Sequence, residues 1–212
     1  APLMEALKTT GLCGVFCGLE AANNDDLTLY NKRARIEDNK RVLELFNSYH
    51  IHVDIGFILY NPYSTVERLR KNMLFLNEYG YASCFAYFKS KYRLYRGTML
   101  YERVVKEGLK TESFFNDPFC YKFVHPEIEL LTDYIIAQIE TINQRTNIDN
   151  MSYYYHAYYI PMLIYLERQL QYHGERTLVD AVAINERTVK KELALLGNNN
   201  TKWFIKLLDL VE

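Results

Sequence analysis

The stretch that decides the fold is "GVFCGLEAANNDDLTLYNK", from Gly14 to Lys32. It begins with a short apolar run of the kind that forms a buried strand, and this run ends at the carboxylate of Glu20. A polar loop then leads to the lysine at position 32. A carboxylate directly after an apolar strand loses hydration, which costs free energy unless a partner offsets it. Three readings follow: Glu20 faces a ligand, pairs with Lys32, or is an ordinary surface carboxylate.

Two more apolar runs follow the first one. They are "IHVDIGFIL", at 51–59, and "YASCFAYF", at 81–88. Helical periodicity separates the runs, over 36–49 and over about 64–80, so the sequence predicts the strand–helix alternation of a parallel α/β fold. The second run is nearly continuous in apolar residues, which indicates a strand covered on both faces. Three strands do not close a barrel, so we expect further strands outside this chain.

The character of the sequence changes after residue 112. The segments 125–143 and 151–174 predict two long helices, and Pro161 is expected to kink the second one. The remainder predicts two short helices within 176–197 and a final helix over 198–212. We therefore predict an α/β domain over 1–112 and an all-helical domain over 113–212.

Composition excludes several classes of protein. The chain has 212 residues, 49% of them hydrophobic, so a sizeable core is expected. Its 25 basic and 26 acidic residues give a net charge of −1, which provides no general attraction to nucleic acid or to an anionic membrane. We expect a cytoplasmic protein with no membrane span, whose four cysteines are free thiols. The chain lacks an initiator methionine, so we expect a fragment of a longer protein.

Ligands bind at the carboxyl ends of parallel strands. In this chain those ends are expected at 18–20, at 59–62 and after Phe88. Gly18 would let a ligand approach the backbone closely. Glu20 could accept hydrogen bonds from an ammonium group or from ribose hydroxyls. The carboxyl ends of the strands are therefore the candidate site.

The order of four motifs resembles the radical S-adenosylmethionine enzymes, and most closely their subgroup with an N-terminal cobalamin-binding domain. The motifs are Gly18-Leu19-Glu20-Ala21, the turn from Leu29 to Lys32, Gly56-Phe57-Ile58 running into Pro62, and Gly97-Thr98-Met99-Leu100-Tyr101. The resemblance covers residues 3 to about 112. The helical tail shares no motif with the family.

This resemblance implies a partial (βα)6 barrel, of which the chain holds the C-terminal half, strands four to six. It implies S-adenosylmethionine lying across the strand ends, a [4Fe–4S] cluster, and cobalamin in the subgroup. Glu20 would contact the ribose or amino-acid part, and the backbone near Ile58 and the side chain of Tyr87 would flank the adenine. The cofactor-binding residues implied are Gly18, Glu20, Lys32, Gly56, Ile58, Tyr60 and Tyr87. No catalytic residue is assigned.

The chain departs from the family at its hallmark. The CxxxCxxC motif that holds the cluster is absent, and Cys13 and Cys17 have the first spacing but lack the third cysteine. The turn after the fifth strand carries Tyr60 and Tyr63, where the family usually has glycines and an acid. We therefore expect the cluster ligands in the N-terminal half of a longer parent enzyme, and this chain alone to be inactive. The parent would cleave S-adenosylmethionine reductively to a 5′-deoxyadenosyl radical or transfer a methyl group, to a substrate that the sequence does not identify.

A different class of function also fits part of the sequence. The segment 178–196 resembles a helix-turn-helix with its turn at Ile184-Asn185, which would make the tail a non-catalytic binding module with DNA as one partner. The missing turn glycine and the low basic charge argue against nucleic acid. His50 and His52 are expected to face solvent, and no histidine has metal-ligand spacing, so no metal site is predicted.

Overall fold

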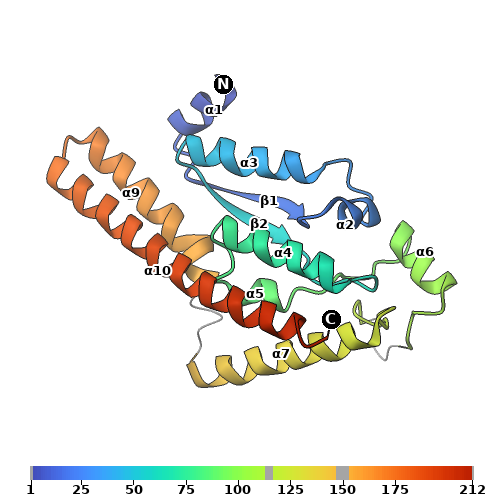
Figure 1. The fold of residues 1–212 in the computed structure, drawn as a ribbon. Coiled ribbons are helices and arrows are strands. Elements are labelled where there is room, and N and C mark those ends of the chain that lie inside the picture. Colours follow the sequence, from blue (N-terminus) through green and yellow to red (C-terminus); the bar gives the residue numbers. More distant parts are fainter. Residues whose placement is uncertain (1, 113–116, 147–152, 212) are drawn as a thin grey trace.

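The computed structural model describes residues 2–112, 117–146 and 153–211 (Figure 1). Its sheet consists, over these ranges, of two parallel strands, β1 (Gly14–Glu20) and β2 (His52–Phe57). Their register pairs Gly14 with His52 and Gly18 with Gly56, and a bulge follows between Gly18 and Glu20. The predicted α/β class with parallel strands is confirmed, and the barrel beyond these two strands stays a prediction.

Helices on one side cover the two strands. The helices before, between and after them are α1 (Pro2–Thr9), α2 (Asn24–Leu29), α3 (Ile36–Ser48) and α4 (Val66–Glu78). Val53, Ile55 and Phe57 are buried and share one core with the apolar faces of α3 and α4. The alternate residues His52, Asp54 and Gly56 are only half-buried. The expectation of a strand covered on both faces is therefore wrong, because the second face of "HVDIGF" carries polar and small residues.

The predicted third strand, at 81–88, is wrong. This segment contains the short helix α5 (Phe85–Phe88) and is buried along nearly its whole length. A short apolar run looks the same whether it is a buried strand or a buried helical turn, so the pattern alone could not decide. The chain returns to the sheet a little later, where the Tyr60 N–H donates to the Ser90 carbonyl and the Tyr92 N–H donates to the Tyr60 carbonyl. This contact forms an isolated parallel bridge between Tyr60 and Lys91.

Most of the described residues after α5 are helical, in line with the helices predicted for the tail. This part of the chain contains α6 (Met99–Lys106), α7 (Pro126–Thr146), the π-helical turn η1 (Tyr155–Tyr159), α9 (Ile160–Tyr172) and α10 (Arg176–Leu208). Figure 1 shows α9 and α10 as an antiparallel pair, and α10 then runs on along α4. The irregularity expected at Pro161 takes the form of η1 directly before it, which is one of the usual ways a helix accommodates a proline.

The predicted helix-turn-helix is wrong. Residues 176–208 form one continuous helix of 33 residues, and Ile184 and Asn185 lie inside it. Neither residue stops a helix as glycine or proline would. From Glu186 to Leu208 the helix also presents buried residues, so packing supports the helix that follows the expected turn. The helix-turn-helix pattern therefore no longer supports DNA binding by the tail.

The α/β part and the helical tail share a core. One cluster of buried side chains joins Ile55 of β2 and Leu69 of α4 to Ile135 of α7 and to Phe204 of α10. The domain boundary predicted after residue 112 adjoins residues 113–116, which lie outside the described ranges, and it stays a prediction. Among the described residues, no helix is both long enough and apolar enough to cross a membrane.

Candidate functional site

Glu20 stands at the carboxyl end of β1 in an unusual backbone conformation. Its φ is +68°, in the left-handed region that residues with a Cβ seldom adopt. The Glu20 carbonyl accepts a hydrogen bond of 2.8 Å from the N–H of Ile58, which holds it beside β2. A left-handed non-glycine residue costs about 1–2 kcal/mol and is concentrated at functional sites. The backbone strain at Glu20 therefore makes this strand end a candidate functional site.

Two facing glycines make room for the Glu20 carboxylate. A Cβ placed on Gly18 would lie 2.6 Å from Glu20 Oε1, so the side chain bends back over the strand into space that only glycine leaves free. A Cβ on Gly56 would lie 3.3 Å from the Gly18 Cα, and 3.0 Å from the ring of Phe16. The absence of a Cβ at these two positions thus lets the Glu20 carboxylate lie over Gly18 and the Phe16 ring lie over Gly56.

Glu20 and Lys32 form an ion pair. Lys32 Nζ lies 3.1 Å from Glu20 Oε1 and 3.5 Å from the Gly18 carbonyl oxygen. The lysine side chain is 39% exposed and the glutamate side chain 23%. A partly exposed pair of this kind contributes only about 0–1 kcal/mol to stability. The pair therefore forms as the sequence allowed, but it does not account for the strained backbone under it.

The structure brings some of the predicted site residues together and separates others. Gly18, Glu20, Lys32, Gly56 and the backbone of Ile58 meet at one strand end. The side chain of Tyr60 is fully buried in the core, and its hydroxyl has no hydrogen-bond partner within the described residues. Tyr87 is also buried, and its hydroxyl donates to Asp54 Oδ1 at 3.4 Å.

The open face of the sheet was not anticipated from the sequence. Phe16 is 70% exposed, and Asp54 lies opposite it in the strand register. Burial raises the pKa of Asp54, partly offset by hydrogen bonds from the Ile55 backbone and from Tyr87. A carboxylate and a bare aromatic ring thus continue the surface that begins at the glycines. The alternation of polar and apolar residues in "HVDIGF" was the signal for this face.

A buried polar network supports the loop that carries Lys32. Asp26 is completely buried, and its carboxylate accepts hydrogen bonds from Asn23 at 2.7 Å and from Asn61 at 3.0 Å. The Arg68 guanidinium lies 3.4 Å from the same carboxylate and adds a charge-assisted contact. Such satisfied networks fix loop geometry. The run "AANNDD" contained this signal in its amide and acid residues, but not the identity of its distant partners.

A cavity of about 500 Å³ lies beyond this network, between α2, α4 and α6. Arg68 and Arg103 are part of its wall, and the Arg103 guanidinium stacks 4.0 Å from the centre of the Tyr63 ring. Tyr63 in turn donates a hydrogen bond to Glu107. The residues lining the cavity do not include Glu20 or Lys32, so it is separate from the glycine-floored strand end.

At the opposite, amino end of the strands, two histidines are buried. Burial lowers the pKa of His52 to about 3, helped by the nearby His156, and it lowers the pKa of His156 to about 4. The two rings are stacked with centroids 6.1 Å apart, and His156 Nε2 lies 2.9 Å from the Ser83 hydroxyl. The expectation that His52 faces solvent is wrong, because the η1 turn packs over it.

Among the described residues, no three cysteines converge as an iron–sulfur cluster would require. Burial raises the pKa of both Cys13 and Cys17, and iron–sulfur clusters are held by thiolates. Cys13 lies instead beside Arg168, with its Sγ 3.7 Å from the guanidinium.

Comparison with known proteins identifies solved structures with a similar fold. No protein-family model and no curated protein matches the sequence. Two solved structures of the cobalamin-dependent S-adenosylmethionine radical enzyme OxsB do match, at 17% sequence identity. The structure with aqua-cobalamin and S-adenosylmethionine bound matches 99% of this chain with a TM-score of 0.53. The structure with aqua-cobalamin alone matches 97% with a TM-score of 0.51.

This chain has the fold of part of that enzyme. The likeness extends through the helical tail, for which the sequence offered no family motif. The chain spans 39% of the length of the OxsB chain in both structures. At this level of identity the match shows the fold, and the ligands in the OxsB structures are a starting point for a proposal about this chain.

Proposed function

We propose that this chain is the part of a radical S-adenosylmethionine enzyme that binds S-adenosylmethionine at the carboxyl end of β1 and β2. The observation that carries the proposal is the strained Glu20 held above the Gly18–Gly56 pair. The ordered motifs and the fold shared with OxsB support it. With a [4Fe–4S] cluster, bound S-adenosylmethionine supplies a 5′-deoxyadenosyl radical, or a methyl group where cobalamin takes part. The cluster ligands, the cobalamin site and the substrate site are proposed to lie in the N-terminal half of the parent.

The charges at the strand end suit the amino-acid part of the ligand. This part is a zwitterion, with one ammonium and one carboxylate close together. Glu20 and Lys32 present one negative and one positive group 3.1 Å apart, and both are accessible from solvent. Charge-assisted hydrogen bonds to such groups are roughly twice as strong as neutral ones. In this proposal the two side chains neutralise each other without ligand and exchange partners when it binds.

The adenine would lie over the open face of the sheet. The exposed ring of Phe16 lies over Gly56 there, and Ile58 is half-buried nearby. In this proposal the backbone near Ile58 flanks the adenine, whereas the ring of Tyr87 is buried against Phe57 and Tyr81. The Tyr60 side chain is packed inside the core, and its backbone N–H and carbonyl bond to Ser90 and Tyr92, so Tyr60 is left out of the proposed contacts.

Ligand titration tests this proposal. We would measure binding of S-adenosylmethionine and of 5′-methylthioadenosine, which lacks the amino-acid part, by saturation-transfer NMR and calorimetry. Glu20→Gln should weaken S-adenosylmethionine by about 1.5–3 kcal/mol, the cost of a lost charged hydrogen bond. If Glu20 holds the ammonium group, methylthioadenosine should bind the variant and the wild type equally; if it holds ribose hydroxyls, both ligands should weaken.

The matched control is Glu37→Gln, an exposed glutamate on α3 that should leave both affinities unchanged. Affinity of the wild-type chain for S-adenosylmethionine is expected to be modest, because part of the site is proposed to come from the missing half. If the wild-type chain binds neither ligand at millimolar concentration, the proposal is wrong. It is also wrong if Glu20→Gln lowers the melting temperature while both affinities stay the same.

A further inference from the structure

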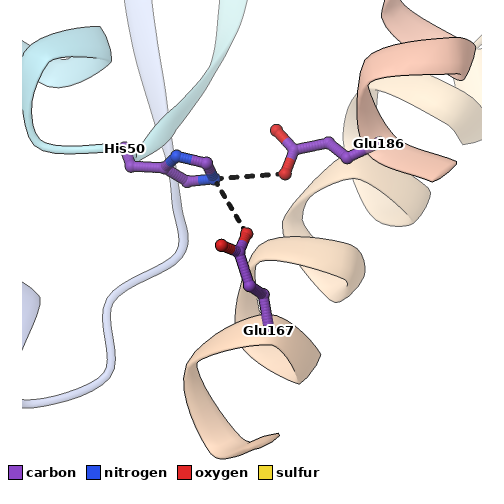
Figure 2. Close-up of side chains that lie close together, drawn as sticks. All are labelled: His50, Glu167 and Glu186. Atoms are coloured by element: carbon purple, nitrogen blue, oxygen red, sulfur yellow. Dashed lines mark hydrogen bonds and ion pairs between the residues drawn. The ribbon is translucent and has the colours of Figure 1, made fainter. Parts of the chain in front are cut away.

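Three ligand-type side chains converge at the amino end of the strands, far in sequence from one another (Figure 2). His50 precedes β2, Glu167 comes from α9 and Glu186 from α10. His50 Nε2 lies 3.1 Å from one Glu186 oxygen and 3.7 Å from one Glu167 oxygen. These three atoms all lie within 4.8 Å of one another.

The outer oxygen of each carboxylate is held by a residue one helical turn further along. Lys190 Nζ lies 2.6 Å from Glu186 Oε1, and Gln171 Nε2 donates to Glu167 Oε1 at 3.2 Å. The inner oxygen, Oε2, of each carboxylate is thereby left pointing at His50 Nε2. Outer partners that orient ligand side chains in this way are typical of metal sites.

The backbone that carries His50 is also fixed. Arg168, the neighbour of Glu167 on α9, donates to the His50 carbonyl at 2.7 Å and to the Tyr49 carbonyl at 3.4 Å. It donates to the Leu12 carbonyl as well, at 2.6 Å. The imidazole and one of the carboxylates are therefore tied together through the main chain, independently of any contact between them.

We propose that His50, Glu167 and Glu186 bind a zinc ion. Zinc takes imidazole nitrogen and carboxylate oxygen at about 2.0–2.1 Å, and neighbouring ligand atoms of a tetrahedral site at that radius are about 3.3 Å apart. The distances of 3.1 Å and 3.7 Å from His50 Nε2 lie on either side of this value. Three protein ligands leave a fourth position for water.

The charge of the cluster favours a cation. Glu186 has a side chain only 5% exposed, and Lys190 contacts its outer oxygen. The polar partner of Glu167 here is the neutral Gln171. The inner oxygens of both carboxylates face the single Nε2 of His50, which can bond well to only one of them.

The ion would join three segments. It would tie the α9–α10 pair to the residue that leads into β2, at the end of the sheet opposite to Glu20. This inference does not depend on the proposed function, because no residue of the strand-end site takes part.

Zinc titration of the metal-stripped chain tests the inference. We expect one equivalent to bind at pH 7.5 with micromolar or tighter affinity, with a rise in melting temperature. Cobalt in place of zinc should give the visible absorption of a four-coordinate nitrogen–oxygen site. Glu167→Gln and Glu186→Gln should each weaken zinc at least tenfold and remove the rise in melting temperature. The control, Glu192→Gln, alters an exposed glutamate on the same helix α10 and should bind zinc like the wild type.

The alternative is that a protonated His50 simply pairs with both carboxylates. In that case the chain binds no zinc at 100 µM, and the proposal is overturned. It is equally overturned if both glutamine variants bind zinc like the wild type, which would place the ion on thiols. Glu167 is the more accessible of the two carboxylates, so Glu167→Gln carries the test if Glu186→Gln fails to fold.

Discussion

The two ends of the β1–β2 pair are built in different ways. At the carboxyl end, Glu20 and Lys32 lie partly exposed above two glycines, and the backbone of Glu20 is strained. At the amino end, His52 lies against His156 of η1, and α9 and α10, with the buried Glu186, close this end from the far end of the sequence. The carboxyl end is open, and the strained backbone of Glu20 lowers stability there. The amino end is closed by packing between segments that are distant in the sequence.

This difference indicates where function and stability are located. Ligand-binding segments come from the less stable parts of a structure, because they must exchange one set of contacts for another. The carboxyl end has this character, and its polar network holds the loop without covering the site. The amino end depends on the helical tail and on the protonation of buried groups. Substitutions at the amino end should therefore change mainly the free energy of unfolding. Substitutions at the carboxyl end should change mainly ligand affinity.

The largest expected effect comes from the helix that closes the amino end. Phe204 on α10 is completely buried and packs edge-on against Phe88, with ring centroids 5.7 Å apart. Phe204→Ala should lower the free energy of unfolding by about 3–5 kcal/mol. Urea unfolding followed by circular dichroism and by fluorescence of the single tryptophan, Trp203, would measure this loss.

The same experiment asks whether the tail is a separate domain. Because the core is shared, both probes should report one coincident transition. Tyr172→Ala removes an aromatic side chain that is 85% exposed and should change the midpoint little. Two separate transitions would show that residues 113–212 fold on their own, as the sequence predicted.

The next largest effect on stability is expected from mild acid, which should act on the histidines at the amino end. The pKa values of His52 and His156 are lowered in the folded state to about 3 and about 4, against about 6.5 when unfolded. The unfolded chain therefore takes up protons first as pH falls. Stability is complete above about pH 6.5 and is lost toward pH 4. Between pH 6.5 and 5 the two groups together should cost about 3 kcal/mol.

Urea unfolding at several pH values would measure this slope. His156→Gln keeps a group that can bond Ser83 but cannot be protonated, so it should roughly halve the loss. The control is His173→Gln, at an exposed histidine. The carboxylate of Glu186, whose pKa is lowered to about 2, adds stability that is lost only as pH falls below about 4.5. An unchanged slope in His156→Gln would contradict the assignment of a buried neutral imidazole.

Local patterns predicted the carboxyl end better than the amino end. The strand ending at Glu20, the helices near 36–49 and 64–80, and the possible pair with Lys32 were all readable from spacing within a short segment. The burial of His52 was not readable, because η1 covers it from a distant part of the chain. The grouping of His50 with Glu167 and Glu186 depends in the same way on how α9 and α10 pack.

Two predictions of secondary structure failed for related reasons. The run at 81–88 is apolar because it is buried, and burial alone does not distinguish a strand from a helical turn. The helix-turn-helix failed because nothing at Ile184-Asn185 breaks a helix, and the packing of α10 on α9 and α4 extends it. Both errors concern how a segment is buried, which tertiary contacts determine.

At the carboxyl end, Lys32→Gln should affect ligand affinity more than stability. If Lys32 holds the carboxylate of S-adenosylmethionine, the variant should bind this ligand about tenfold more weakly, equivalent to about 1.4 kcal/mol. The affinity for 5′-methylthioadenosine should stay the same, since that molecule lacks the carboxylate. Calorimetry with both ligands would measure this. Tighter binding of S-adenosylmethionine by Lys32→Gln would instead show that Lys32 competes with the ligand for Glu20.

The smallest expected effect is the difference in stability between two substitutions at Glu20. Both Glu20→Ala and Glu20→Gly remove the ion pair, which is worth at most about 1 kcal/mol. Only Glu20→Gly also relieves the left-handed strain at φ +68°. Glu20→Gly should therefore be more stable than Glu20→Ala by up to about 1 kcal/mol, after the greater freedom of glycine in the unfolded chain is subtracted. Both variants should bind S-adenosylmethionine at least tenfold more weakly than the wild type.

The matched control is the same pair of substitutions at Glu44, an exposed position inside α3. There the order should reverse, with glycine about 1 kcal/mol less stable than alanine, because helical backbone favours alanine. Thermal and urea unfolding would rank the four variants. If Glu20→Gly is less stable than Glu20→Ala, the left-handed conformation at Glu20 is not a strained one. If it is more stable and has lost the ligand, then Glu20 is kept at a cost to stability that only binding explains.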